Sequence, residues 1–247
     1  MKLFDKFKAL LTSHSHPFTS AIIVAGGIGS RMSSDIPKQH MLINGIEVVA
    51  RTMLAFEACE LIDEIVVVCR EGENDVYEGY KQSYNISKLA RIVCGGNSRQ
   101  ESALCGFEAV DKKSKFVAIH DAVRCLIDTG DIESTLRAAY KYRAATAVLR
   151  AYDTVKLCDE NGFVSETIDR DKVFLAATPQ VFSHDLYLTA SYSAKKDGVS
   201  VTDDNALAER LGFKVKLVPC KHPNMKITTP FDIEIAKALT NDKARGK

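Results

Sequence analysis

Short apolar runs rich in Val and Ile alternate with longer stretches of helical pattern through the first 150 residues. Both faces of these runs are apolar, which is typical of buried parallel strands. The runs are residues 21–25, 64–69, 90–94, 116–119 and 146–149, and the helical patterns are 46–59, 73–82, 99–110 and 131–143. This alternation predicts an α/β fold, a three-layer αβα Rossmann-like sandwich around a mostly parallel, twisted sheet.

The pattern changes after residue 150, where two strand-like stretches flank a turn. Residues 153–158 and 163–167 surround the turn at 159–162, so we expect a β-hairpin near 153–168. Inserted between the strand at 146–149 and the next strand, at 173–182, this hairpin would protrude from the body as an arm. The remaining expected elements are helices at 183–196, 203–211 and 230–239 and strands at 214–218 and 225–228.

The two ends of the chain differ from this central part. Five apolar residues recur at helical spacing within residues 2–12, which predicts a short amphipathic helix followed by a linker over 14–20. We interpret residues 1–19 as an extension that docks on the body or on a partner, because its apolar stripe is too short and too weakly basic for a membrane surface. Residues 20–240 form one expected domain, and 241–247 form a polar tail.

Composition excludes several classes of function. With 33 basic and 32 acidic residues the net charge is +1, which argues against a surface that binds nucleic acid. No apolar run approaches the roughly 18 residues of a membrane span, and residues 1–20 lack a signal-peptide pattern. No two of the seven cysteines have the CxxC spacing of a metal site. We therefore expect free thiols in a cytoplasmic protein.

The most informative loop follows the first strand: Ala25-Gly26-Gly27-Ile28-Gly29-Ser30-Arg31-Met32, and then Pro37-Lys38-Gln39. Glycines let backbone N–H groups approach a phosphate closely. The pattern does not fit a dinucleotide fingerprint or a P-loop, because it lacks the third glycine and the Gly-Lys-Ser/Thr sequence. Two cations that flank a glycine turn instead predict a site for a polyphosphate, with Arg31 as a fork and Lys38 as a point charge.

The loop and five later motifs, in the same order, resemble the 2-C-methyl-D-erythritol 4-phosphate cytidylyltransferase family of sugar-phosphate nucleotidyltransferases. The later motifs are His120-Asp121-Ala122-Val123-Arg124, Asp153-Thr154-Val155-Lys156 with Asp169-Arg170, Ala177-Thr178-Pro179-Gln180-Val181-Phe182, Val201-Thr202-Asp203-Asp204 and Met225-Lys226-Ile227-Thr228. The resemblance covers residues 20–240. It implies transfer of the cytidylyl group of CTP to 2-C-methyl-D-erythritol 4-phosphate, with release of pyrophosphate, in non-mevalonate isoprenoid biosynthesis.

The resemblance assigns roles to residues at the matching positions. Arg31, Lys38 and Lys226 would be the catalytic cations. The nucleotide would contact Ala25, Gly26, Gly27, Gly29, Gly96, Asn97, Ser102 and Ala122. Asp121 follows the strand at 116–119 at its carboxyl end, where an open α/β sheet places its ligand, and it would contribute one carboxylate to Mg²⁺. We interpret His120 as structural.

The acceptor side is implied by the same resemblance. The sugar phosphate would contact Asp121, Arg124, Thr154, Lys156, Arg170, Thr178 and Thr202. Because the arm residues of the family reach the other subunit, we expect a homodimer formed through the arm. An isolated two-stranded hairpin is only marginally stable, so the arm needs a surface to cover.

Two alternatives remain open at this point. Ribitol 5-phosphate cytidylyltransferases share the scaffold, and they also have Ala-Gly-Gly in the first loop and a Val before the Arg of the His-Asp motif, as Val123 and Arg124 do here. A catalytically silent nucleotide-binding module on the same fold is the second alternative. The presence of Arg31, Lys38, Asp121 and Lys226 argues against it.

Overall fold

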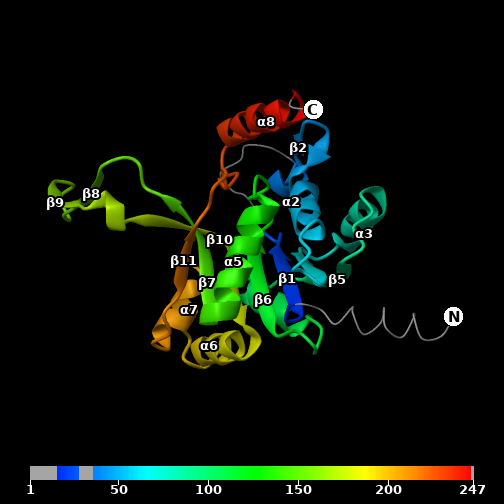
Figure 1. Ribbon diagram of the computed structural model, residues 1–247, viewed down its shortest axis with the longest axis horizontal. Helices are drawn as coiled ribbons and strands as arrows, with labels where there is room; N and C mark the ends of the chain where they lie inside the picture. Colours follow the sequence, from blue (N-terminus) through cyan, green and yellow to red (C-terminus); the bar gives the residue numbers. More distant parts are fainter. Residues whose placement is uncertain (1–15, 28–35, 246–247) are drawn as a thin grey trace.

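The computed structural model describes residues 16–27 and 36–245, with side chains as far as residue 241 (Figure 1). The predicted helix at 2–12, Gly29 and Arg31 lie outside the described residues. The body is a seven-stranded sheet in the order β11-β7-β10-β6-β1-β4-β5. Its strands are β1 Thr19–Val24, β4 Glu64–Cys69, β5 Leu89–Cys94, β6 Phe116–Asp121, β7 Ala144–Arg150, β10 Phe174–Ser183 and β11 Lys216–Pro219.

The sheet is mostly parallel, as predicted. β1 pairs in parallel with both β4 and β6, β4 with β5, and β7 with β11. Only β10 runs antiparallel to its neighbours, β6 and β7. Six strands therefore run in one direction and end at one edge of the sheet, and β10 begins at that same edge.

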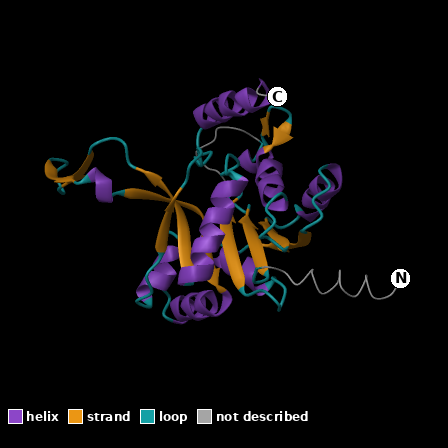
Figure 2. Cartoon of the chain, in the orientation of Figure 1, coloured by secondary structure: helices purple, strands orange, loops and turns teal. Residues whose placement is uncertain are grey.

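Helices cover both faces of the sheet, which confirms the three-layer fold (Figure 2). Along β1, Ala21 and Ile23 pack on one face and Ile22 on the other, because successive side chains of a strand alternate. The first face is covered by α2 Val48–Glu57, α3 Asn74–Ser83 and α5 Thr129–Tyr142, and the second by α4 Arg99–Glu108, α6 His184–Lys196 and α7 Asn205–Arg210. Gly106 lets α4 approach closely, since a Cβ there would lie 2.4 Å from Ile22 Cγ2.

The predicted arm is present as β8 Val155–Cys158 and β9 Val164–Ile168, which form a separate two-stranded sheet. It extends away from the body at the left of Figure 1. The turn is closed by Asp159, whose Oδ1 accepts hydrogen bonds from the backbone N–H groups of Asn161 and Phe163. A short 3-10 helix, η2 Arg170–Lys172, follows the arm and leads into β10.

Four local predictions were wrong or incomplete. The chain turns at Asn44-Gly45, both at positive φ, into a small hairpin of β2 Leu42–Ile43 and β3 Ile46–Glu47, so α2 begins two residues later than expected. The expected strand at 225–228 does not form: these residues have no regular secondary structure, and within the described chain their backbone pairs with the body through one bond, from Ile227 N to Val123 O.

The other two differences concern the ends of the domain. β1 begins at Thr19, so residues 19 and 20 belong to the sheet rather than to the predicted linker. The last helix, α8 Pro230–Arg245, continues through most of the predicted polar tail, because no Gly or Pro interrupts it before Gly246. The loop after β1 leads into a 3-10 helix, η1 Lys38–His40, which places Lys38 near the edge of the sheet.

Within residues 16–27 and 36–245, the helices lack the combination of length and apolar character needed to cross a membrane.

Candidate active site

The carboxyl ends of β1, β4, β5 and β6 border a cavity of about 620 Å³. Ligands of open α/β sheets bind at this edge, where the strand order allows a crevice. Ten of the predicted site residues line the cavity: Ala25, Gly26, Gly27, Lys38, Gly96, Asn97, Ser102, Asp121, Ala122 and Lys226. The structure therefore brings together the described part of the predicted nucleotide site.

Asp121, the last residue of β6, is surrounded by three cations. Its Oδ1 accepts from Arg99 Nε at 2.9 Å and its Oδ2 from Lys226 Nζ at 2.8 Å, while Arg124 Nε lies 3.6 Å from Oδ2. Burial by itself would raise the pKa of the Asp121 carboxyl, but Arg99, Lys226 and Arg124 outweigh burial and hold that pKa well below its usual range. Asp121 is therefore a fixed negative charge beside a group of cations.

Lys226 reaches this position from the far end of the chain. Ile227 N donates to Val123 O over 2.8 Å, which ties the segment before α8 to the loop after β6. Asn224 reinforces the join, because its Nδ2 donates to Thr178 O at 2.7 Å. These bonds place a lysine 105 residues away in sequence directly opposite Asp121.

His120 and Thr178 support Asp121 from behind the cavity. Thr178 Oγ1 accepts from Asp121 N at 3.1 Å and lies 3.0 Å from His120 Nδ1. Complete burial lowers the pKa of His120 to about 3, so the imidazole is neutral at physiological pH. This agrees with the interpretation of His120 as structural, and it shows that the Thr178 hydroxyl already serves the protein itself.

The turn after β5 is built for close packing. A Cβ on Gly95 would lie 2.6 Å from Ser102 Oγ, and a Cβ on Gly96 would lie 2.5 Å from Glu101 Cβ. Ser98 caps α4 by accepting from Glu101 N at 3.0 Å, and Glu101 accepts from Asn97 N at 2.8 Å. Only a glycine pair lets this backbone line the cavity against the first turn of α4.

Two arginines in the cavity wall were not predicted as site residues. Arg70, after β4, donates from Nη2 to Gly27 O at 2.6 Å, and Arg99 joins Asp121 to Asp204. Arg70 directly follows Cys69 at the end of β4, and Arg99 follows the Gly95-Gly96 turn after β5, so each comes after the carboxyl end of a strand that borders the cavity. Their position at the ligand edge of the sheet was the sequence signal that could have identified both arginines as site residues.

The remaining described residues of the predicted site do not line the cavity. Arg124 is turned away from it and donates from Nη1 to Asn224 O at 2.8 Å, and Thr202 is exposed on the loop before α7. Thr154, Lys156 and Arg170 lie on or beside the arm, where Lys156 Nζ donates to Thr167 Oγ1 and Arg170 Nη1 to Tyr152 O. The arm, which extends away from the body, thus contributes no residue to the cavity of its own chain (Figure 1).

The donor set suits a magnesium ion that is bound mainly by phosphate. Within the described parts of the chain, no cluster of three or more His, Cys, Asp or Glu side chains could hold a metal on its own. Asp121 is the carboxylate at the cavity edge of β6, and each of its oxygens has a further lone pair. One carboxylate plus phosphate oxygens and water is a common way to hold Mg²⁺.

Known proteins match this chain over nearly its whole length. The family described as IspD, 2-C-methyl-D-erythritol 4-phosphate cytidylyltransferase, matches residues 19–242. The chain is 41% identical to the protein of that name from Clostridium acetobutylicum over 220 residues, 89% of this chain and 96% of the relative. It is 40% identical to the protein of that name from Syntrophus aciditrophicus over 224 residues, 90% and 96% of the two chains.

Solved structures agree with the sequence comparison. The crystal structure of 4-diphosphocytidyl-2C-methyl-D-erythritol synthase from Anaerococcus prevotii matches with a TM-score of 0.81 and 31% identity, covering 91% of this chain and 98% of that one. The Thermus thermophilus 2-C-methyl-D-erythritol 4-phosphate cytidylyltransferase matches with a TM-score of 0.73 and 27% identity over the same shares. The extent and identity of these matches lead to one conclusion: the chain belongs to the 2-C-methyl-D-erythritol 4-phosphate cytidylyltransferase family.

Proposed function

We propose that this enzyme transfers the cytidylyl group of CTP to 2-C-methyl-D-erythritol 4-phosphate and releases pyrophosphate. The observation that carries the proposal is the convergence of Lys38, Lys226 and the glycine turns on one cavity beside Asp121. Lysines and backbone N–H groups at the ligand edge of an α/β sheet are suited to a triphosphate. The family membership supplies the identity of the two substrates.

The transfer requires positioning and charge stabilisation rather than a covalent enzyme intermediate. An oxygen of the acceptor's phosphate attacks the α-phosphorus of CTP, and the bond from that phosphorus to the bridging oxygen of pyrophosphate breaks. Lys38 and Lys226 would stabilise the negative charge that develops on the α-phosphate and the leaving group. Arg31 is proposed to join them, as the sequence predicts.

The nucleotide and the metal ion would share the cavity. Backbone groups of Ala25, Gly26, Gly96 and Asn97 are proposed to contact the cytidine part, which the close approach at the two glycine turns supports. Asp121 would contribute one ligand to Mg²⁺, which when bound would neutralise phosphate charge. Wild-type enzyme should accordingly lose activity in excess chelator and regain it with Mg²⁺.

The acceptor is proposed to bind between two subunits. Thr154, Lys156 and Arg170 do not line the cavity of their own protomer, and the arm and its base carry exposed apolar side chains, with Phe163 73% and Tyr152 81% exposed. A partner subunit would cover these side chains and receive the arm's polar residues. Arg124, Thr178 and Thr202 are proposed to act on the acceptor from the body of the protein.

The state of the cysteines supports the proposal that the reaction takes place in the cytoplasm. All seven are free thiols in the structure, and Cys59, Cys69 and Cys125 are buried in the core. Reduced, buried thiols are typical of proteins in the cytoplasm.

The test is an assay of pyrophosphate release with Mg²⁺, each of the four nucleoside triphosphates and each of two acceptors. We expect turnover with CTP, and a higher kcat/KM with 2-C-methyl-D-erythritol 4-phosphate than with ribitol 5-phosphate. A preference for ribitol 5-phosphate would refute the acceptor but keep the chemistry. No release with any pair of substrates would refute the enzyme and favour a silent nucleotide-binding module.

A further inference from the structure

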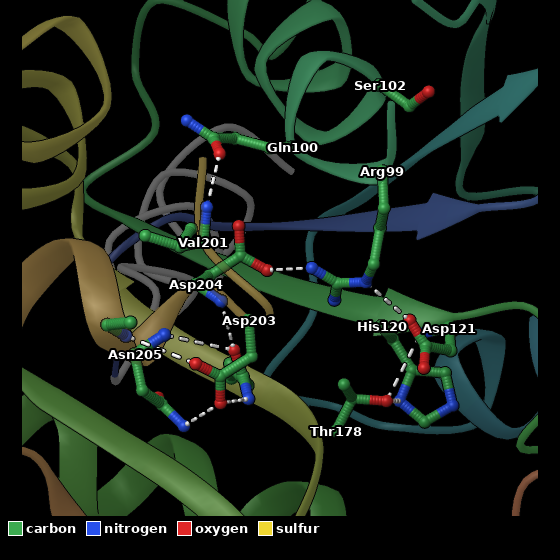
Figure 3. Close-up of polar contacts among 12 residues, drawn as sticks. Arg99, Gln100, Ser102, His120, Asp121, Thr178, Val201, Asp203, Asp204 and Asn205 are labelled. Carbon is green, nitrogen blue, oxygen red and sulfur yellow. Dashed lines mark hydrogen bonds and ion pairs between the residues drawn. The ribbon is translucent and has the colours of Figure 1, made fainter. Parts of the chain in front are cut away.

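Arg99, the first residue of α4, joins two carboxylates from distant parts of the chain (Figure 3). Its Nε donates to Asp121 Oδ1 over 2.9 Å and its Nη1 to Asp204 Oδ2 over 2.6 Å. The side chains of Asp121 and Asp204 are 9% and 1% exposed, so both ion pairs are sheltered from water. We propose that Arg99 is a positioning residue of the proposed transfer reaction, on which this inference rests: it orients the Asp121 carboxylate from the anchored side chain of Asp204.

Asp204 is a rigid anchor because two other elements hold it. Its backbone N donates to Gln180 Oε1 in β10 at 2.8 Å, and the buried hydroxyl of Tyr187 in α6 donates to its Oδ1 at 3.0 Å. The second carboxylate oxygen, Oδ2, is the one that Arg99 contacts. The outer end of the guanidinium is therefore fixed by contacts that do not involve the cavity.

The first turn of α4 is held to the same loop by a second residue. Gln100 Nε2 donates to Val199 O at 3.1 Å, and Gln100 Oε1 accepts from Val201 N at 3.0 Å. These two bonds join the start of α4 to the loop that precedes Asp204, and they thereby hold the backbone of Arg99 close to Asp204. A side chain fixed at its backbone and at its outer end can keep Asp121 in one orientation.

The other cations near Asp121 do not provide this constraint. Lys226 contacts Oδ2, but its side chain is 37% exposed and lines the cavity, where it is proposed to bind phosphate. Arg124 lies 3.6 Å from Oδ2, beyond hydrogen-bond length. Arg99 contacts Oδ1 instead and is itself held by the buried Asp204, so the Asp121 carboxylate stays oriented when Lys226 turns to a ligand.

Arginine suits this task better than lysine. Its planar fork presents several donors in fixed directions, so one side chain can hold two carboxylates at once, whereas an ammonium is a single point charge. Removal of Arg99 alone would leave Asp204 as an uncompensated buried charge, which is strongly destabilising. The informative variant therefore removes both charges together.

The experiment compares the double variant Arg99→Gln/Asp204→Asn with the wild-type enzyme and with Arg99→Lys. A matched control, Arg210→Gln/Asp197→Asn, removes another arginine–carboxylate pair, at α7 and the end of α6. Steady-state kcat and both KM values are measured with CTP and the methylerythritol phosphate, together with the melting temperature. We expect the first double variant to fold and to lose about 10- to 100-fold in kcat, as loss of a supporting contact typically does.

The pattern of kinetic constants separates the positioning role from its alternatives. The KM for CTP should stay within about twofold of wild type, since the glycine turns and Lys38 remain, and Arg99→Lys should recover part of the lost kcat. Wild-type kcat in the double variant would show that the pair is only structural and would overturn the proposal. A raised KM for CTP at unchanged kcat would also overturn it, because Arg99 would then bind the nucleotide directly.

Two further results complete the test. If the double variant does not fold, Arg99→Lys decides: a reduced kcat at unchanged CTP KM supports the proposal, and wild-type kinetics overturn it. An equal loss of kcat in the control would overturn it as well. Failure of the proposed function is distinguishable, because the wild-type enzyme itself would then release no pyrophosphate.

Discussion

The guanidinium of Arg70 donates to the carbonyl oxygen of Gly27 over 2.6 Å, and its Nε lies 3.4 Å from Gly26 O. The residue that follows β4 therefore holds the backbone where the chain leaves β1. Because amide groups of a glycine turn bind phosphate through their N–H side, a donor that engages their carbonyl oxygens fixes the orientation of the turn.

We predict that Arg70→Met raises the KM for CTP roughly fivefold to tenfold, since a charge-assisted hydrogen bond at a partly exposed position is lost. The KM for the methylerythritol phosphate should change little. Arg137→Met, which removes an exposed arginine of α5 paired with Glu133, is the control and should leave both constants unchanged. An unaltered KM for CTP in Arg70→Met would contradict the role of this contact.

Lys38 should act mainly in the transition state. Lys38→Ala should lower kcat by about 10²- to 10³-fold, because loss of a preorganised charge costs roughly 3–4 kcal/mol, while the KM for CTP changes much less. Single-turnover rates measured at saturating substrates check this. Near-normal turnover would show that Lys38 has no part in the transfer. Lys115→Ala, a lysine before β6, provides a control far from the cavity edge.

The arm should complete the site of the partner subunit. Lys38→Ala and Arg170→Ala homodimers should each be weakly active, because every site lacks one residue. Mixing the two unfolded chains and refolding them should restore about a quarter of wild-type activity, since half of the dimers are mixed and each of these has one intact site. Sedimentation checks the dimer. No recovery of activity in the mixed dimers would refute assembly of the site across subunits.

Burial of His120 makes stability depend on pH. The folded protein holds the pKa of His120 at about 3, below its ordinary value of 6.5, so the unfolded chain binds the extra proton between these values. The contribution to stability is complete above pH 6.5 and is lost as the pH falls toward 3, by up to about 1.4 kcal/mol per pH unit. Denaturant unfolding between pH 4.5 and 6.5 should show a shallower slope in His120→Gln; equal slopes would contradict the prediction.

The layers and the edge of the sheet that carries the cavity could be predicted because they depend on local patterns. Both faces of β4 are apolar, from Ile65 to Val68, and this alone indicates a strand covered on both sides. The glycine turns that follow β1 and β5 then locate the ligand edge, because parallel strands end together. The predicted hairpin also depended only on adjacent residues, those around the turn at Asp159.

The contacts made by arginine could not be predicted in the same way. Arg99 meets Asp204, 105 residues later, only because α4 and α7 cover the same face of the sheet. The expected strand at 225–228 failed for a related reason: an extended apolar stretch becomes a strand only when a neighbour offers a full ladder, and Val123 offers one bond. Pairing partners of this kind are set by tertiary structure rather than by local sequence.

The reversed direction of β10 has an evolutionary consequence. Arg150 at the end of β7 faces Phe174 at the start of β10, so the chain leaves the sheet for the arm and returns to it at neighbouring positions. Residues 151–173 are thus an excursion between two adjacent strands, and they can be lengthened, shortened or exchanged without rethreading the sheet. With the acceptor contacts proposed above for the arm, a change in these residues would alter acceptor selectivity and leave the nucleotide cavity of the body unchanged.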